Sequence, residues 1–120
     1  MHELSIAQNI VEIIHQYVSE ERLPLVRSIT VDVGAFSGVV PDSLEFSFQA
    51  ITEQTPLHNA FLKMDKIPFK IFCSTCQKEF ENEDGIVQCL ECGSFETNII
   101  SGKELQIKEI EVVDQMMENV

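Results

Sequence analysis

Four cysteines are the residues of this chain best suited to chemistry. Cys73, Cys76, Cys89 and Cys92 follow the spacing C-x2-C-x12-C-x2-C. Each CxxC pair can fold into a turn that points two sulfurs at one metal ion, and two such turns complete a tetrahedron. Four thiolates leave no open coordination position, so the pattern predicts a structural zinc site and not a catalytic one.

Three other uses of the cysteines stay open at this point. They are two short disulfides, a redox CxxC pair, or an iron site of the rubredoxin kind that would colour the protein red. A redox pair is typical of one CxxC after a strand in a βαβ unit, whereas two pairs share one loop here. Gly93 follows the second pair and favours a tight turn, but Gln77 stands at the equivalent place after the first. The small core expected around the metal comprises Phe72, Phe80, Ile86 and Val87.

The N-terminal sequence Met1-His2-Glu3 offers a second set of candidate ligands. The α-amine, the amides of His2 and Glu3 and the His2 imidazole can supply nitrogen ligands near one plane, which suits Ni(II) or Cu(II). The positive end of the helix expected after these residues opposes a cation, which favours an exchangeable site. The alternative is that His2 is an ordinary solvated terminal residue.

The elements that position these groups follow from hydrophobic periodicity. A helix is expected from Ser5 to about Glu20, begun by a capping box of Ser5 and Gln8 that leaves residues 1–3 outside its first turn. Its apolar stripe is Ala7, Ile10, Val11, Ile14, Tyr17 and Val18. Residues 27–36 then alternate as a half-buried strand.

A second helix is expected to begin at Pro41 and Asp42, with Asp42 at the N-cap, and to end near residues 55–56. Its buried face comprises Leu44, Phe48 and Ile51. Residues 60–72 predict one strand, with Pro68 at an edge or an end because proline has no N–H. Residues 103–113 predict a last strand, with a β-bulge near Lys108 and Glu109 where the apolar parity changes.

Together these elements predict a small α+β fold. We expect a three-stranded sheet with two helices on one face and an inserted four-cysteine zinc-ribbon module. The α+β domain comprises residues 1–69 and 101–120, and the insert comprises residues 70–100. An insert of this length is too short to hold a core without a metal or a disulfide.

Composition excludes several classes of function. The 120 residues carry a net charge of −12, and 44% of them are hydrophobic, enough for a real core. Such a surface repels nucleic acid and anionic membranes, and no apolar stretch is long enough to span a bilayer. The absence of a signal-peptide pattern predicts a cytoplasmic protein, where thiols stay reduced. No catalytic constellation appears, so we do not expect an enzyme.

Four segments together resemble the HypA/HybF family of nickel-insertion accessory proteins in [NiFe]-hydrogenase maturation. They are MHELSIAQNIV, VGAFSGVVPDSLEFSF, the two CxxC pairs and SGKELQIKEIEV, which span Met1 to about Val112. The resemblance is specific because the segments occur jointly. One departure is Leu90, where many members of the family have proline.

The resemblance implies a nickel metallochaperone with nickel as cargo and a structural zinc site. Nickel would be bound by His2, with Met1 and Glu3 contributing through the backbone or as accessory groups. Zinc would be held by Cys73, Cys76, Cys89 and Cys92. The implied partners are the GTPase HypB and the hydrogenase large subunit, and also urease accessory proteins and a second copy of the chain as a homodimer.

A zinc-ribbon interaction module in transcription or translation is the alternative function. It would keep the zinc but need no free N-terminus. Such a module requires a basic face, and the insert carries Lys70 and Lys78 against six acidic residues. Charge therefore favours the nickel metallochaperone.

Overall fold

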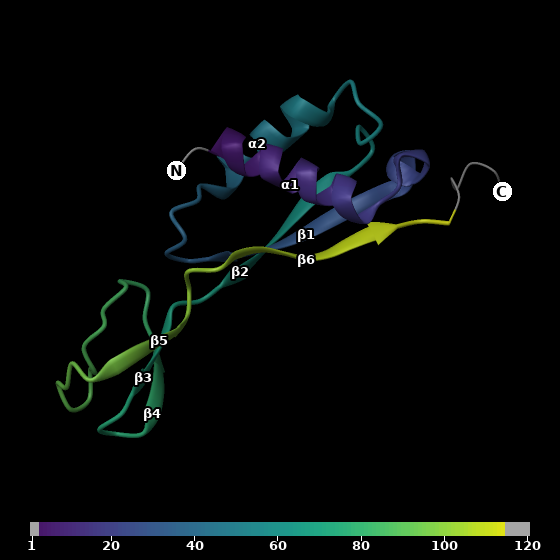
Figure 1. Ribbon diagram of the computed structural model, residues 1–120. Helices are drawn as coiled ribbons and strands as arrows, with labels where there is room; N and C mark the ends of the chain where they lie inside the picture. The colour runs from purple at the N-terminus through teal and green to yellow at the C-terminus, as the bar shows by residue number, and fades with distance from the viewer. Residues whose placement is uncertain (1–2, 115–120) are drawn as a thin grey trace. The chain divides into compact units, whose positions relative to one another are not determined.

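The computed structural model describes residues 3–114, which form two helices, one 3-10 helix and six strands (Figure 1). In chain order they are α1 (Glu3–Tyr17), η1 (Glu20–Leu25), β1 (Val26–Gly34), α2 (Pro41–Thr52), β2 (Phe61–Ile67), β3 (Lys70–Cys73), β4 (Lys78–Glu81), β5 (Thr97–Ser101) and β6 (Leu105–Val112). The strands form two three-stranded sheets, ordered β2-β1-β6 and β4-β3-β5. The predicted α+β class is confirmed.

The chain divides into two compact units. Over the described residues, the first comprises residues 3–31, 39–64 and 107–114, and the second comprises residues 32–38 and 65–106. The second unit contains the whole of the predicted insert, 70–100, but is wider, since it includes both flanks and the loop after β1. The assignment of nickel to the first unit and zinc to the second stays a prediction.

Most of the predicted apolar stripe of helix α1 is buried inside the first unit. It packs beside α2 on one face of the β2-β1-β6 sheet (Figure 1). The buried side chains of α1 are Ile6, Ala7, Ile10 and Ile14. Tyr17 is 78% exposed, so its place in the stripe was wrong. The predicted capping box was also wrong, because α1 begins at Glu3 and Ser5 lies inside its first turn.

Helix α2 begins where predicted but with a different cap. Val40 is the N-cap and Pro41 is the first helical residue, where its fixed φ and missing N–H cost nothing. Asp42 therefore lies inside the helix. The helix ends at Thr52, earlier than predicted, and the Thr52 hydroxyl donates a hydrogen bond of 2.8 Å to the carbonyl of Phe48.

Strand β1 is buried on both sides, so the prediction of a half-buried strand was wrong. It is the central strand of its sheet, flanked by β2 and β6. Even Ser28 and Thr30 are buried, at 1% and 9% exposure. The Ser28 hydroxyl donates a hydrogen bond of 2.9 Å to the carboxylate of Glu111 on β6, which satisfies it.

The apolar residues of β6 follow the predicted change of parity. Leu105 and Ile107 are half-buried, Lys108 and Glu109 are both exposed, and half-burial then resumes at Ile110. The bulge itself stays a prediction. Within residues 3–114, no helix is both long and apolar enough to cross a membrane.

Candidate metal centre

Two residues separate β2 from β3, so the predicted single strand over residues 60–72 was wrong. Strand β2 ends at Ile67, and Pro68 follows it, which agrees with the prediction that Pro68 marks an edge or an end. Strand β3 then pairs antiparallel with both β4 and β5 in a separate sheet. The last residue of β3 is Cys73, so this central strand places the first sulfur.

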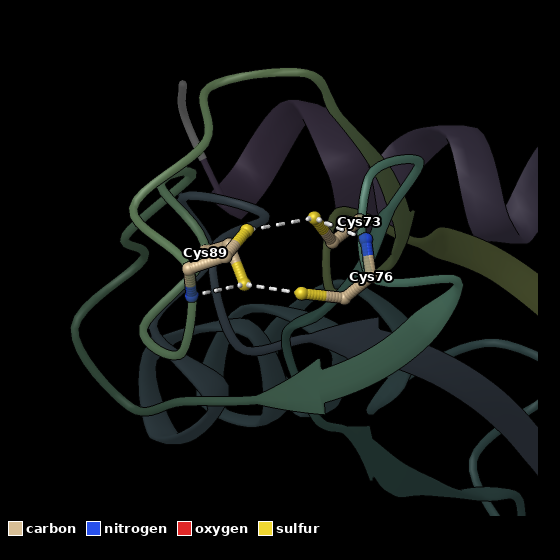
Figure 2. A group of neighbouring side chains, drawn as sticks. Cys73, Cys76 and Cys89 are labelled. Carbon is tan, nitrogen blue, oxygen red and sulfur yellow. Dashed lines mark hydrogen bonds between the residues drawn. The ribbon is translucent and has the colours of Figure 1, made fainter.

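The four cysteine sulfurs lie within 4.8 Å of one another. The Sγ of Cys73 is 3.7 Å from that of Cys92, and the Sγ of Cys76 is 3.8 Å from that of Cys89 (Figure 2). A tetrahedral ion with metal–sulfur bonds of about 2.3 Å requires sulfur–sulfur distances of about 3.8 Å. No disulfide joins these four residues. The donor set and its geometry therefore fit a closed tetrahedral metal site.

Both CxxC turns have the same backbone geometry. The N–H of Cys76 points at the sulfur of Cys73, and the N–H of Cys92 points at that of Cys89, each at 3.4 Å. The residue after each pair has a positive φ, 59° at Gln77 and 77° at Gly93. Gln77 thus adopts the conformation for which glycine is favoured, and its side chain donates a 2.6 Å hydrogen bond to the carbonyl of Ser74.

The two turns are also tied to each other outside the sulfurs. The Thr75 hydroxyl donates a 3.1 Å hydrogen bond to the hydroxyl of Ser94, joining the first turn to the second. Lys78 on β4 forms an ion pair of 3.0 Å with Glu91 inside the second turn. Spacing could not reveal these links, because ordinary surface residue types make them.

The surroundings of the four sulfurs lower the pKa of one cysteine thiol and raise the pKa of another. The backbone N–H of Cys92 stabilises the thiolate of Cys89 and lowers the Cys89 pKa to about 7. The sulfur of Cys92, together with desolvation and the other sulfurs, raises the pKa of Cys76 to about 12. Four thiolates at this separation repel one another, so a cation is needed before all four can ionise.

The predicted core around the metal was partly wrong. Ile86 and Val87 are 37% and 44% exposed, and Phe72 and Phe80 are only half-buried. Alternation along β3 instead turns Ile71 to the same side as Cys73, and both side chains are fully buried. Phe69 and Cys89 are the other buried side chains of this region.

Within the second unit, the backbone at the end of β1 and in the loop after it packs closely against the backbone of Gly102. A Cβ on Gly34 would lie 2.2 Å from the carbonyl carbon of Gly102, which leaves room for glycine alone. The N–H of Phe36 donates a 2.7 Å hydrogen bond to the carbonyl of Gly102. The Phe36 ring meets that of Phe69 edge to face, with centroids 5.2 Å apart.

The predicted nickel ligands fall mostly outside the described residues. Met1 and His2 are among those not described, and Glu3 is the first residue of α1. The expectation that Glu3 lies outside the first turn was therefore wrong. Its carboxylate accepts a 3.1 Å hydrogen bond from the N–H of Val40, a contact that no local sequence pattern indicates.

The other histidines do not join a cluster. His15 on α1 and His58 are exposed, and the Nδ1 of His58 lies 2.9 Å from the carbonyl oxygen of Thr55. Over residues 3–114, the four cysteines are the one group of three or more histidine, cysteine or acidic residues placed to hold a metal.

Known proteins resemble this chain over nearly its whole length. The family model described as "Hydrogenase/urease nickel incorporation, metallochaperone, hypA" matches residues 1–112. The hydrogenase maturation factor HypA of Geobacter metallireducens is 40% identical over 112 residues, 93% of this chain and 99% of that protein. The HypA of Aquifex aeolicus is 38% identical, over 93% and 97% of the two chains.

Solved structures support the same fold. The solution structure of the Ni metallochaperone HypA from Helicobacter pylori matches with a TM-score of 0.66 at 19% identity, covering 96% of this chain and all of that one. A second solution structure of a HypA protein matches with a TM-score of 0.70. The extent of the family match and the curated relatives together show that this chain belongs to the HypA family of hydrogenase and urease nickel-incorporation metallochaperones, which are maturation factors and not enzymes.

Proposed function

We propose that this chain captures Ni(II) at its N-terminus and passes it to the [NiFe]-hydrogenase large subunit during maturation. The observation that carries this proposal is the family match, which begins at residue 1 and so includes the Met1-His2-Glu3 sequence. The α-amine, two backbone amides and the His2 imidazole supply nitrogen donors suited to planar Ni(II). Incoming ligands can attack such a terminal site, which allows release of the cargo.

The four cysteines hold Zn(II) in this proposal. The sulfur–sulfur distances of 3.7 and 3.8 Å support a tetrahedral ion, and four thiolates complete its shell. Zinc would stabilise a three-stranded sheet with few buried apolar side chains, and it carries out no reaction itself. Metal analysis of the purified protein tests this assignment, with about one zinc per chain expected and a red iron protein contradicting it.

The partners expected for this function are the GTPase HypB and the hydrogenase large subunit. Urease accessory proteins are further candidates, because the matching family model names urease as well as hydrogenase. We also propose that the chain associates with itself as a homodimer. Nucleic acid is disfavoured by the net charge of −12 and by the pairing of Lys78 with Glu91.

An equilibrium Ni(II) titration of zinc-loaded protein with its native, untagged N-terminus tests the nickel site. We expect about one nickel per chain in the unmodified protein and loss of this binding in His2→Ala. His15→Ala is the matched control, because His15 is an exposed histidine on α1 and has no proposed role. A second variant with one residue added before Met1 keeps His2 but displaces the α-amine, and should bind nickel weakly.

Two results would contradict the proposal. One is nickel binding that His2→Ala leaves unchanged, and the other is equal loss in His2→Ala and His15→Ala. Zinc content measured on each variant separates loss of the nickel site from loss of the fold.

A further inference from the structure

The surface of the second unit has a hollow of about 370 Å³. Three segments line it: the loop after β1, the end of β2 with the residues that join it to β3, and the chain at the end of β4. The buried Phe69 lies at its floor, and Phe36 and Pro68 add apolar surface. The charged residues of the hollow are all exposed, and they are Lys66, Glu81 and Glu83. The hollow thus combines an aromatic floor with a mainly acidic rim.

The aromatic surface of the hollow is held in place by the folded chain. The Phe36 ring meets the Phe69 ring edge to face, and a Cβ on Gly85 would lie 2.9 Å from the Phe36 ring. The backbone of Gly85 therefore packs against Phe36. The Phe36 side chain is still 41% exposed, so part of its ring remains open to a ligand. The face of an aromatic ring carries negative charge density and attracts cations.

A turn after β4 fixes the backbone that carries the two carboxylates. The Oδ1 of Asn82 accepts a hydrogen bond of 2.9 Å from the N–H of Ile86, and the Nδ2 of Asn82 donates one of 3.0 Å to the carbonyl of Ile86. The N–H of Asn82 donates a hydrogen bond of 3.2 Å to the carbonyl of Phe69. Because Glu81 and Glu83 adjoin Asn82, their backbone is fixed beside the floor before a ligand arrives.

The two carboxylates of the rim lack a cationic partner within the chain. Among the residues that the structure describes, no ion pair involves Glu81 or Glu83. Lys70 is the backbone partner of Glu81 between β3 and β4, but their side chains form no ion pair. Lys66 reduces the negative charge of the rim without cancelling it. The rim therefore complements a ligand that brings a further positive charge.

We propose that this hollow binds an arginine side chain of a partner protein, a role that goes beyond nickel capture and transfer. The planar guanidinium group stacks on aromatic rings, is weakly hydrated and donates paired hydrogen bonds to carboxylates. It would lie against the exposed part of the Phe36 ring, with Glu81 and Glu83 as acceptors. The volume of the hollow is at the lower end of known ligand pockets, which range from about 300 to 1,000 Å³, and so suits one side chain.

The charge of the whole unit favours an arginine within a protein over the free amino acid. The second unit carries nine acidic side chains and four lysines. This excess attracts a cationic surface of a partner, whereas it repels the α-carboxylate of free arginine. A lysine side chain is the weaker alternative, because its compact ammonium group is strongly hydrated and cannot stack.

Nuclear magnetic resonance titration of the zinc-loaded full chain with the peptide acetyl-Gly-Arg-Gly-amide tests the proposal. We expect saturable shifts of the backbone amides at Phe36 and at residues 81–83, with a dissociation constant on the order of millimolar. The same peptide with citrulline keeps the shape of arginine but loses its charge, and should give no saturable shifts. The peptide with lysine, and free arginine, should each bind at least about twofold more weakly.

Substitutions around the hollow should change this affinity in opposite directions. Glu81→Gln and Glu83→Gln should each raise the dissociation constant by about two- to fivefold, as the loss of an exposed ion pair predicts. Lys66→Gln removes a repulsive charge and should lower the constant by about twofold, a result that damage to the fold would not produce. Phe36→Leu should weaken binding by about two- to fivefold, because the aromatic face is lost.

Glu79→Gln is the matched control, because Glu79 is an exposed acidic residue of β4 that does not line the hollow. It changes the net charge as Glu81→Gln does and should leave the affinity nearly unchanged. Zinc content measured on every variant confirms that the unit is intact.

Four results would each overturn the proposal. They are shifts that do not saturate, equal binding of the citrulline peptide, tighter binding of free arginine than of the capped peptide, and equal loss in Glu79→Gln and Glu81→Gln. The last result would show that the peptide responds only to the overall charge. None of these measurements depends on the N-terminal nickel site, so the nickel titration succeeds or fails independently.

Discussion

The carboxylate of Glu3, the first residue of α1, accepts a hydrogen bond of 3.1 Å from the backbone N–H of Val40, the N-cap of α2. The contact joins residues 37 positions apart and occupies a donor that α2 cannot satisfy by itself. It also fixes the residue that directly follows His2. The side chain of Glu3 thus has a structural role that is separate from any role of its backbone amide.

Removal of this carboxylate should destabilise the first unit. We expect Glu3→Ala to lower the free energy of unfolding by about 1 kcal/mol, the usual cost of a lost helix cap. Glu3→Gln keeps an acceptor oxygen and should recover most of the loss. Urea unfolding followed by circular dichroism measures both, and equal stability of the alanine variant and the original chain would contradict the assigned role.

Metal retention at the cysteines should weaken as pH falls. Bound metal requires thiolates, and protons compete for them, so acid favours the metal-free form. The pKa of Cys89 is lowered to about 7 and that of Cys76 is raised to about 12, so Cys76 is protonated at neutral pH without metal. Affinity should fall roughly tenfold per pH unit for each thiol protonated in the metal-free protein.

Competition against a chelator of known affinity, measured at several pH values, determines this dependence. The slope should steepen as pH falls through the region near 7, where Cys89 also becomes protonated. Zinc affinity that does not change with pH would be incompatible with four thiolate ligands.

The residue after the first CxxC pair has a strained backbone conformation, and a substitution by glycine should relieve that strain. Gln77 has φ of 59°, a left-handed conformation that costs a residue with a side chain about 1–2 kcal/mol relative to glycine. We expect Gln77→Gly to raise stability by about 1 kcal/mol or less, because the variant also loses the hydrogen bond from Gln77 to Ser74. Thermal unfolding of the zinc-loaded protein measures the change, and clear destabilisation would show that this hydrogen bond outweighs the strain.

Close approach at Gly34 should make this position intolerant of any side chain. The added methyl group of Gly34→Ala would lie 2.2 Å from backbone of Gly102, and we expect a loss of about 3 kcal/mol or more. Gly38→Ala is the control, since nothing lies within 4 Å of its Cβ and only its φ of 85° opposes alanine. Denaturant unfolding should therefore show the larger loss at Gly34, and equal losses would contradict the clash.

The sequence by itself determined those features that depend on residue type and short spacing. The two CxxC pairs predicted four sulfurs around one centre, because each pair is a local turn with a fixed reach. Helical periodicity likewise identified Ala7, Ile10 and Ile14 as buried, since one apolar stripe has to face a core. The start of α2 near Pro41 and Asp42 was predicted from the capping pattern, although Val40 and not Asp42 is the N-cap.

Tertiary structure alone decided the features that depend on distant partners. The strand predicted over residues 60–72 divides at Pro68 because its two halves pair in different sheets. Ser28 on β1 is buried and its hydroxyl donates a hydrogen bond to Glu111 on the neighbouring strand β6, which alternation along β1 alone could not show. Glu3 meets Val40, and Gly34 meets Gly102, through chain folding over long separations. Local patterns carry no information on such encounters, because the energy that selects them comes from packing of the whole unit.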